Sequence, residues 1–151
     1  MADTYSASTI AKWFVAWADD EDALTNMKLQ KLLYYAQGHH LARYGRPLFD
    51  DEIQAWSHGP VVPSVYRQFK RFGAAPLELR DEDAFSWDDV DSETADYLGQ
   101  VWNSYGGFTA ARLRNMSHDE GPWIAAWGQG DSRDSEIGLA SMTSFFESIT
   151  V

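Results

Sequence analysis

One long helix, predicted between Thr25 and Gly45, is the feature that most constrains how this chain can fold. Residues on one stripe of this segment recur at helical spacing, and they are Leu29, Leu32, Leu33, Ala36 and His40. The hydroxyl of Thr25 is placed to cap the first turn, and Gly45 followed by Arg46-Pro47 supplies the stop. A long helix with one apolar face has to be covered by other elements, which favours a mainly α fold.

Shorter helical patterns fill most of the remaining chain. We expect further helices at about 9–18 (with Ser8 as its cap), 63–72 (with Pro63 in its first turn), 92–105, 109–116, 123–127 and 137–149. Two brief segments, Ile53–Trp56 and Leu77–Leu79, are candidates for a pair of strands. The polar connection after Trp127 joins pieces too small to fold separately. The prediction is a mainly α fold: a single compact helical domain, residues 1–151, of about six helices with a short two-strand β-ribbon.

The net charge of the chain limits the kinds of partner that it can bind. Acidic side chains number 23 against 12 lysines and arginines, and the net charge is −11. Such a field repels phosphate backbones and anionic membranes, so we expect no nucleic-acid partner and no membrane partner. The chain has no cysteine, and its first residues, MADTYSAST, carry neither a basic nor an apolar run. We therefore expect a cytoplasmic location and no signal peptide.

The first motif, TNMKLQKLLYYAQGHH, places lysines and tyrosines on the flank of the long helix. Lys31 and Tyr35 are four residues apart, so the ammonium can lie near the ring or its hydroxyl. The alternative is a half-buried core helix with lysines that extend to solvent. Neighbouring helical residues point about 100° apart, so His39 and His40 cannot easily share a metal ion. We expect no metal site here.

The second motif, AWSHGPVVPSVY, predicts a rigid, aromatic corner. Gly59 allows a sharp turn, while Pro60 and Pro63 restrict the backbone after it and hold the following helix at a set angle. Such a corner has a low ordering cost when a partner docks, and Trp56 and Tyr66 are residue types that often anchor contacts. The alternative is that both rings fill the core. The sequence places no nucleophile or carboxylate beside His58, so it does not indicate catalysis.

The third motif, MSHDEGPW, precedes a helix start at Pro122 and Trp123. Carboxylates ahead of a helix N-terminus complement its dipole, so a capping role explains the stretch without chemistry. A hydrolase would use His118 as a base and Glu120 as an orienting acid or ligand. That alternative lacks a nucleophile motif and a second histidine at ligand spacing.

Taken together and in this order, the three motifs resemble the Panacea domain family, also described as SocA-like antitoxins of bacteria and prophages. The similarity runs from about residue 9 to residue 149. The resemblance implies a mainly helical domain that neutralises a cognate protein toxin encoded by the adjacent gene, by direct binding and without a reaction of its own. It implies no catalytic residue, cofactor or metal. A proteolytic adaptor that delivers its partner to a protease remains an alternative, as does, less favourably, the hydrolase using His118 and Glu120.

The motifs also supply candidate structural and contact residues. Within the motifs, the predicted structural set is Gly59, Pro60, Pro63, His118, Pro122 and Trp123. The predicted partner-binding set is Lys28, Lys31, Tyr35, Trp56, His58 and Tyr66. The acidic runs Asp19–Asp22 and Asp81–Asp91 are expected to steer a basic partner, or simply to be solvated faces that keep the protein in solution.

Overall fold

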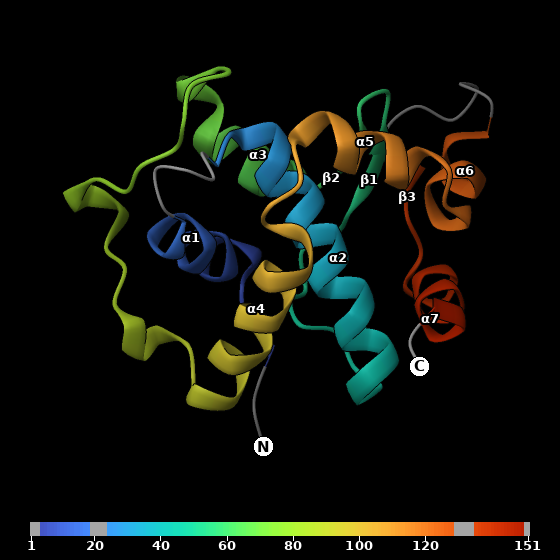
Figure 1. Ribbon diagram of the computed structural model, residues 1–151, viewed down its shortest axis with the longest axis horizontal. Helices are drawn as coiled ribbons and strands as arrows, with labels where there is room; N and C mark the ends of the chain where they lie inside the picture. Colours follow the sequence, from blue (N-terminus) through green and yellow to red (C-terminus); the bar gives the residue numbers. More distant parts are fainter. Residues whose placement is uncertain (1–3, 19–23, 129–134, 150–151) are drawn as a thin grey trace.

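Helix α2 (Asn26–Tyr44) runs through the middle of the computed structural model, with the other helices arranged around it (Figure 1). The structure describes residues 4–18, 24–128 and 135–149; the acidic run Asp19–Asp22 and most of the polar connection after Trp127 lie outside these ranges. The predicted ends of α2 are confirmed. Thr25 Oγ1 accepts a hydrogen bond from Lys28 N at 3.3 Å, and Gly45 adopts a left-handed conformation with φ 73°.

The surrounding helices confirm the mainly α fold. They are α1 (Ala7–Trp17), α3 (Pro63–Phe69), α4 (Ser92–Tyr105), α5 (Ala110–His118), α6 (Gly121–Trp127) and α7 (Leu139–Ile149). Helix α2 contacts α1, α3, α4, α5 and α7, so it is buried around most of its circumference. Its buried face is therefore much wider than the single stripe predicted from helical spacing.

The first helix begins earlier than predicted. Ser6, and not Ser8, is the N-cap: it has extended backbone angles, and its hydroxyl accepts from Thr9 N at 3.2 Å. Ser8 lies inside α1, where its hydroxyl donates to Gln68 Oε1 at 2.9 Å. Serine is a favoured N-cap residue at either position, so the position of the extended backbone decides which serine is the cap.

The predicted β-ribbon exists with a different partner strand. Within the described residues a small antiparallel sheet has the order β2-β1-β3, with β1 at Gln54–Trp56, β2 at Gly59–Val61 and β3 at Ser135–Glu136. Trp56 pairs with Gly59, so β1 and β2 form a tight hairpin whose turn is Ser57-His58. Residues 77–79 form no strand; instead Leu77 N donates to Leu24 O at 2.7 Å.

The acidic interval 80–91 is more ordered than the predicted loop. It contains two short 3₁₀ helices, η2 (Asp81–Asp83) and η3 (Trp87–Asp89). Carboxylates close both turns: Asp83 Oδ2 accepts from Arg80 N at 2.7 Å, and Asp89 Oδ2 accepts from Ser86 N at 2.9 Å. Some of these acids therefore order the backbone as well as contributing charge. In the described part of the chain, no helix combines the length and apolarity needed to cross a membrane.

Candidate partner-binding site

The three sequence motifs meet at one place, where α2, the β1–β2 hairpin and the α5–α6 corner pack together. Lys31 lies at the centre of this contact and is fully buried. Its ammonium donates to Pro60 O at 3.1 Å and lies 3.4 Å from Met27 Sδ. Burial, and to a smaller extent the positive charge of Arg114, lowers the pKa of Lys31 to about 7. The amine therefore links α2 to the hairpin. Helical spacing predicted a contact between Lys31 and Tyr35, but the hydrogen bond is made to Pro60 O.

Gly59 makes this close approach possible. Its φ of 107° is one that side-chain-bearing residues rarely adopt, and a Cβ there would lie 2.9 Å from Lys31 Cε and 3.0 Å from Ser117 Oγ. Pro60 and Pro63, which follow Gly59, are both buried, and Pro63 occupies the first turn of α3 as predicted. The structural role expected of this corner follows from these contacts.

A second polar chain joins the start of α2 to α3. Gln30 Oε1 accepts from Val62 N at 2.9 Å, and its amide donates to Asn26 Oδ1 at 2.8 Å. Asn26 in turn donates to the carbonyl of Tyr66 at 3.1 Å. The sequence analysis missed Asn26; an amide side chain in the first turn, four residues before a buried glutamine, was the available signal.

Glu120 does not have the capping role predicted for it. Its side chain caps no backbone N–H of α6 and instead accepts from two tyrosines of α2. Tyr34 Oη donates to one carboxylate oxygen and Tyr35 Oη to the other, each at 2.9 Å. Burial raises the pKa of Glu120, whereas the two hydroxyl donors act in the opposite direction. Burial and the nearby carboxylate both raise the pKa of each tyrosine, so the hydroxyls remain donors.

His118 and Trp123 close the outer side of this network. Trp123 Nε1 donates to Trp56 O at 2.9 Å, which joins α6 to the hairpin. The His118 ring lies against Trp123 with 4.3 Å between centroids, and burial lowers the pKa of His118. Both carboxylate oxygens of Glu120 are already bonded to tyrosines, so His118 and Glu120 are not arranged as a base and its orienting acid. Within the described residues, no group of three potential ligands could hold a metal ion.

The structure divides the predicted partner-binding residues into two groups. Lys28, Lys31 and Tyr35 are buried; Lys28 donates to the carbonyl of Gly106 and lies 5.5 Å from the centroid of the Trp102 ring. The other three residues reach the surface at the corner. His58 is exposed at the hairpin turn, and the half-buried rings of Trp56 and Tyr66 meet edge to face at 5.1 Å. Only this second group is available to a docking protein in the folded state.

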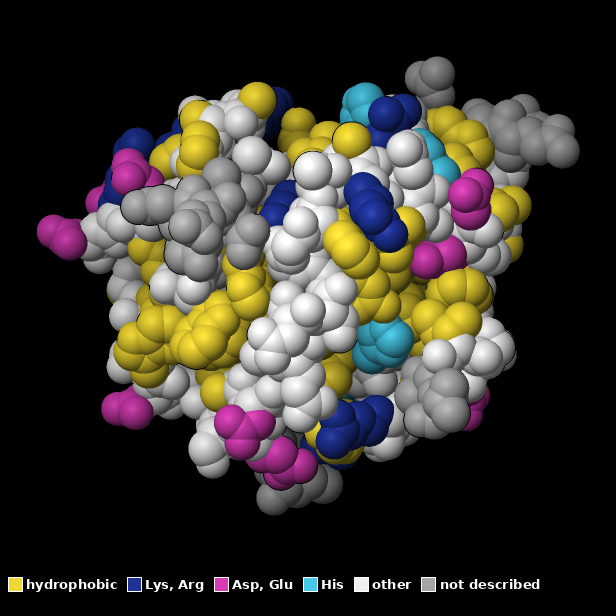
Figure 2. All heavy atoms as spheres, in the orientation of Figure 1, with side chains coloured by type: hydrophobic (Ala, Val, Ile, Leu, Met, Phe, Trp, Pro, Cys, Tyr) yellow, Lys and Arg dark blue, Asp and Glu magenta, His cyan; other side chains and the backbone are white. Residues whose placement is uncertain are grey.

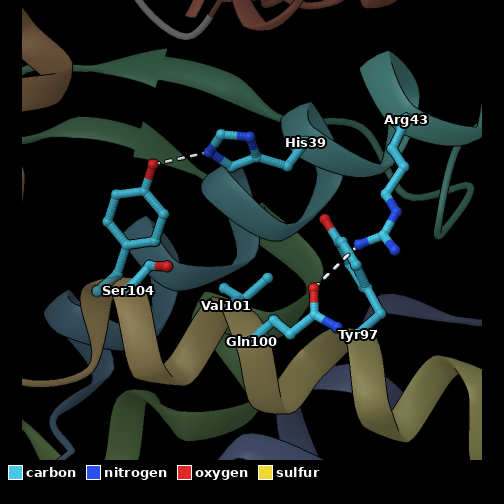
Figure 3. A pocket seen from close by; sticks show the side chains of 7 residues that line it. His39, Arg43, Tyr97, Gln100, Val101 and Ser104 are labelled. Carbon is cyan, nitrogen blue, oxygen red and sulfur yellow. Dashed lines mark hydrogen bonds between the residues drawn. The ribbon is translucent and has the colours of Figure 1, made fainter. Parts of the chain in front are cut away.

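A separate cavity of about 220 Å³ opens between α2 and α4 (Figure 3). His39 and Arg43 project into it from α2, and Gln100 and Ser104 from α4. Its main polar groups already bond across the opening: His39 Nε2 lies 2.7 Å from Tyr105 Oη, and Arg43 donates to Gln100 Oε1 at 2.9 Å. His39, the former metal candidate, thus links the two helices.

Comparison with known proteins gives a match over the region that holds the motifs. The family model described as antitoxin SocA-like, Panacea domain, matches residues 29–124. The chain belongs to this family. The expected resemblance is confirmed, and the Panacea match begins in α2 and ends in α6, so it includes the hairpin and the buried network around Lys31 and Glu120.

A named relative supports the Panacea assignment. The chain is 35% identical over 117 residues to antitoxin SocA of Caulobacter vibrioides (strain NA1000 / CB15N). The aligned region covers 71% of this Panacea chain and 62% of the relative, so the chain spans less than two thirds of that protein's length. No solved structure matches.

Proposed function

We propose that this protein is an antitoxin that neutralises a cognate protein toxin by direct binding and catalyses no reaction itself. The observation that carries the proposal is the Panacea family match over residues 29–124, together with the relative named antitoxin SocA. The toxin is encoded by the adjacent gene of a bacterial or prophage locus, and the pair acts in the cytoplasm.

The surface corner supplies the proposed contacts. Trp56, His58 and Tyr66 reach solvent from a hairpin and a helix whose backbones are held by Lys31, Gln30 and Trp123. A partner docking on such a surface orders few side chains, so less binding free energy is lost to conformational entropy. Lys31 contributes by holding the hairpin from within, and Tyr35 by bonding to Glu120 at the start of α6, whereas Lys28 bonds to the carbonyl of Gly106.

Charge supports the same proposal. A net charge of −11 attracts a basic toxin surface and raises the rate of encounter. Most acids of the 80–91 interval are exposed, with Asp83 as the buried exception, so they contribute to that field. An acidic protein that covers a basic active surface blocks it by occupation.

Co-expression with the neighbouring gene product tests the proposal. We expect that product to arrest bacterial growth alone, and growth to recover when this chain is present in a stable complex with it. A harmless product, or one that stays toxic while bound to an excess of this chain, would contradict the proposal. Loss of the partner through a shortened lifetime, without a stable complex, would instead identify the adaptor alternative.

The contact residues can be tested with variants of the corner. We expect the double variant Trp56→Ala with Tyr66→Ala to weaken the complex by about a hundredfold, because aromatic anchors at interface centres carry much of the binding energy. Leu139→Ala is the matched control, since Leu139 is 44% exposed and lies on α7. If both variants fold correctly and bind the toxin with equal affinity, the toxin contacts a different surface of this protein.

A further inference from the structure

A groove lined by three tryptophans lies outside every motif described above. Trp13 and Trp17, four residues apart on α1, stack with 5.2 Å between ring centroids and 14° between planes. Trp87 of η3 meets both rings edge to face, at 6.2 Å from each. In Figure 2, hydrophobic side chains gather at the left of the visible face, over α1 and the segment that precedes α4, with acidic side chains at their edge.

The exposure of these rings is unusual for residues in an ordinary core. Trp17 is 51% exposed and Trp87 is 52% exposed, while Trp13 beneath them is 3% exposed. Large apolar side chains exposed side by side mark interaction surfaces more often than single exposed residues do. The rings are also held in place, because Trp17 is part of α1 and the η3 turn is closed by Ser86 and Asp89.

Helix α4 forms the other wall of the groove. The cavity is about 360 Å³ and is lined on this side by Ala95, Asp96, Gly99, Gln100 and Asn103. Apart from the neighbours of Gly99 in α4, no described residue comes within 4 Å of the position of a Cβ there, so none of their side chains fills the space above the helix.

The charged residue that lines the groove is acidic. Asp96 is a lining residue, and the exposed Asp88 and Asp89 follow Trp87 directly. No lysine or arginine is among the lining residues in the described part of the chain. An occupant of this groove therefore meets indole faces and the carboxylate of Asp96, while the guanidinium of Arg43 is bonded to the lining amide of Gln100.

We propose that the groove formed by Trp13, Trp17, Trp87 and Asp96 binds an arginine side chain presented by a basic segment of a partner protein. A guanidinium is planar and weakly hydrated, so it stacks on an exposed indole and pairs with a carboxylate at the same time. Asp96 supplies that carboxylate beside the rings. The proposal goes beyond the antitoxin function and does not depend on the corner containing Trp56.

A peptide probe tests the chemistry directly. We use N-acetyl-Gly-Arg-Gly-amide, with the citrulline peptide as its uncharged isostere, and follow the indole N–H resonances of the tryptophans by NMR. We expect the arginine peptide to shift the Trp17 and Trp87 resonances in a saturable way. The citrulline peptide should bind at least about fivefold more weakly. Equal binding of the two peptides would overturn the proposal, as would shifts confined to Trp56 and Trp123.

Variants locate the site and exclude self-association. Trp87→Ala and Asp96→Asn should each weaken the arginine peptide about fivefold or more, whereas Trp56→Ala should leave its affinity unchanged. Unchanged binding to Trp87→Ala would overturn the proposal. So would concentration-dependent dimerisation that Trp87→Ala abolishes, because a second copy of the chain would then occupy the groove. None of these measurements uses the toxin, so their outcome is separate from that of the co-expression test.

Discussion

The buried network beneath the corner and the tryptophan groove on α1 show opposite uses of the same residue types. In the network, a lysine, a glutamate, two tyrosines and a tryptophan are bonded to one another or to backbone, between segments far apart in the sequence. In the groove, Trp17, Trp87 and Asp96 face solvent, and no motif includes them. The buried residues of the three motifs therefore hold this part of the protein together, and contact surfaces have to be sought at exposed positions.

The largest expected effect is at the glycine that lets the network form. Gly59→Ala forces a Cβ into an unfavourable φ and against Lys31 and Ser117, so we expect a loss of about 4 kcal/mol in the free energy of unfolding, measured by urea denaturation. Gly45→Ala is the control, because Gly45 also has a positive φ, in the left-handed region, and no described residue comes within 4 Å of its Cβ position; it should cost about 1 kcal/mol. Similar losses for both would mean that the close packing at Gly59 is unimportant.

Removal of the shared acceptor comes next. Glu120→Ala leaves the hydroxyls of Tyr34 and Tyr35 without their partner in a buried setting, so we expect a loss of about 3 kcal/mol. The neighbouring exposed residue provides the control, and Asp119→Ala should change stability by less than about 0.5 kcal/mol. If Glu120→Ala left the free energy of unfolding unchanged, this carboxylate would not contribute to the stability of the network.

The buried lysine gives the network a dependence on pH. Its pKa is about 7 in the folded protein and returns to its ordinary value of 10.5 on unfolding, so the unfolded chain binds the extra proton between these values. Stability should therefore rise by about 2 kcal/mol between about pH 7 and pH 9. Lys31→Met should remove this rise, which urea denaturation at each pH would measure. The same slope in the variant would assign the effect to another group.

The smallest expected effect is in the groove. Trp87 is half exposed, so Trp87→Ala should lower the free energy of unfolding by less than about 1 kcal/mol, while affecting binding far more. Thermal unfolding followed by circular dichroism would measure it. If Trp87→Ala lost as much stability as Glu120→Ala, the groove would belong to the structural core, and the two regions would not differ in the way described.

Local features were predicted well from the sequence. The caps of α2 at Thr25 and Gly45 and the entry of α3 at Pro63 were identified correctly, because caps depend on side chains and backbone within a few residues of each other. The Panacea resemblance was also found from the order of three motifs. Where two nearby serines could both cap α1, the composition rule chose the wrong one.

Long-range partners were not predictable in this way. Glu120 was assigned to the helix it precedes, but it bonds to tyrosines 85 and 86 residues away. Lys31 was paired with Tyr35 along its own helix, but it reaches a carbonyl 29 residues away. Helical spacing places Trp13 and Trp17 on one face of α1, but nothing in the sequence joins Trp87 to them, since Trp87 lies in an acidic interval predicted to be a loop.

The amino-acid order alone determined where α2 begins and ends, which residues are apolar enough to be covered, the acidic charge and the family. Tertiary structure decided which polar groups became partners, and which aromatic rings stayed outside. The reason is physical: helical spacing and capping act over a few residues, whereas a buried charge or an exposed ring depends on which distant segments pack beside it.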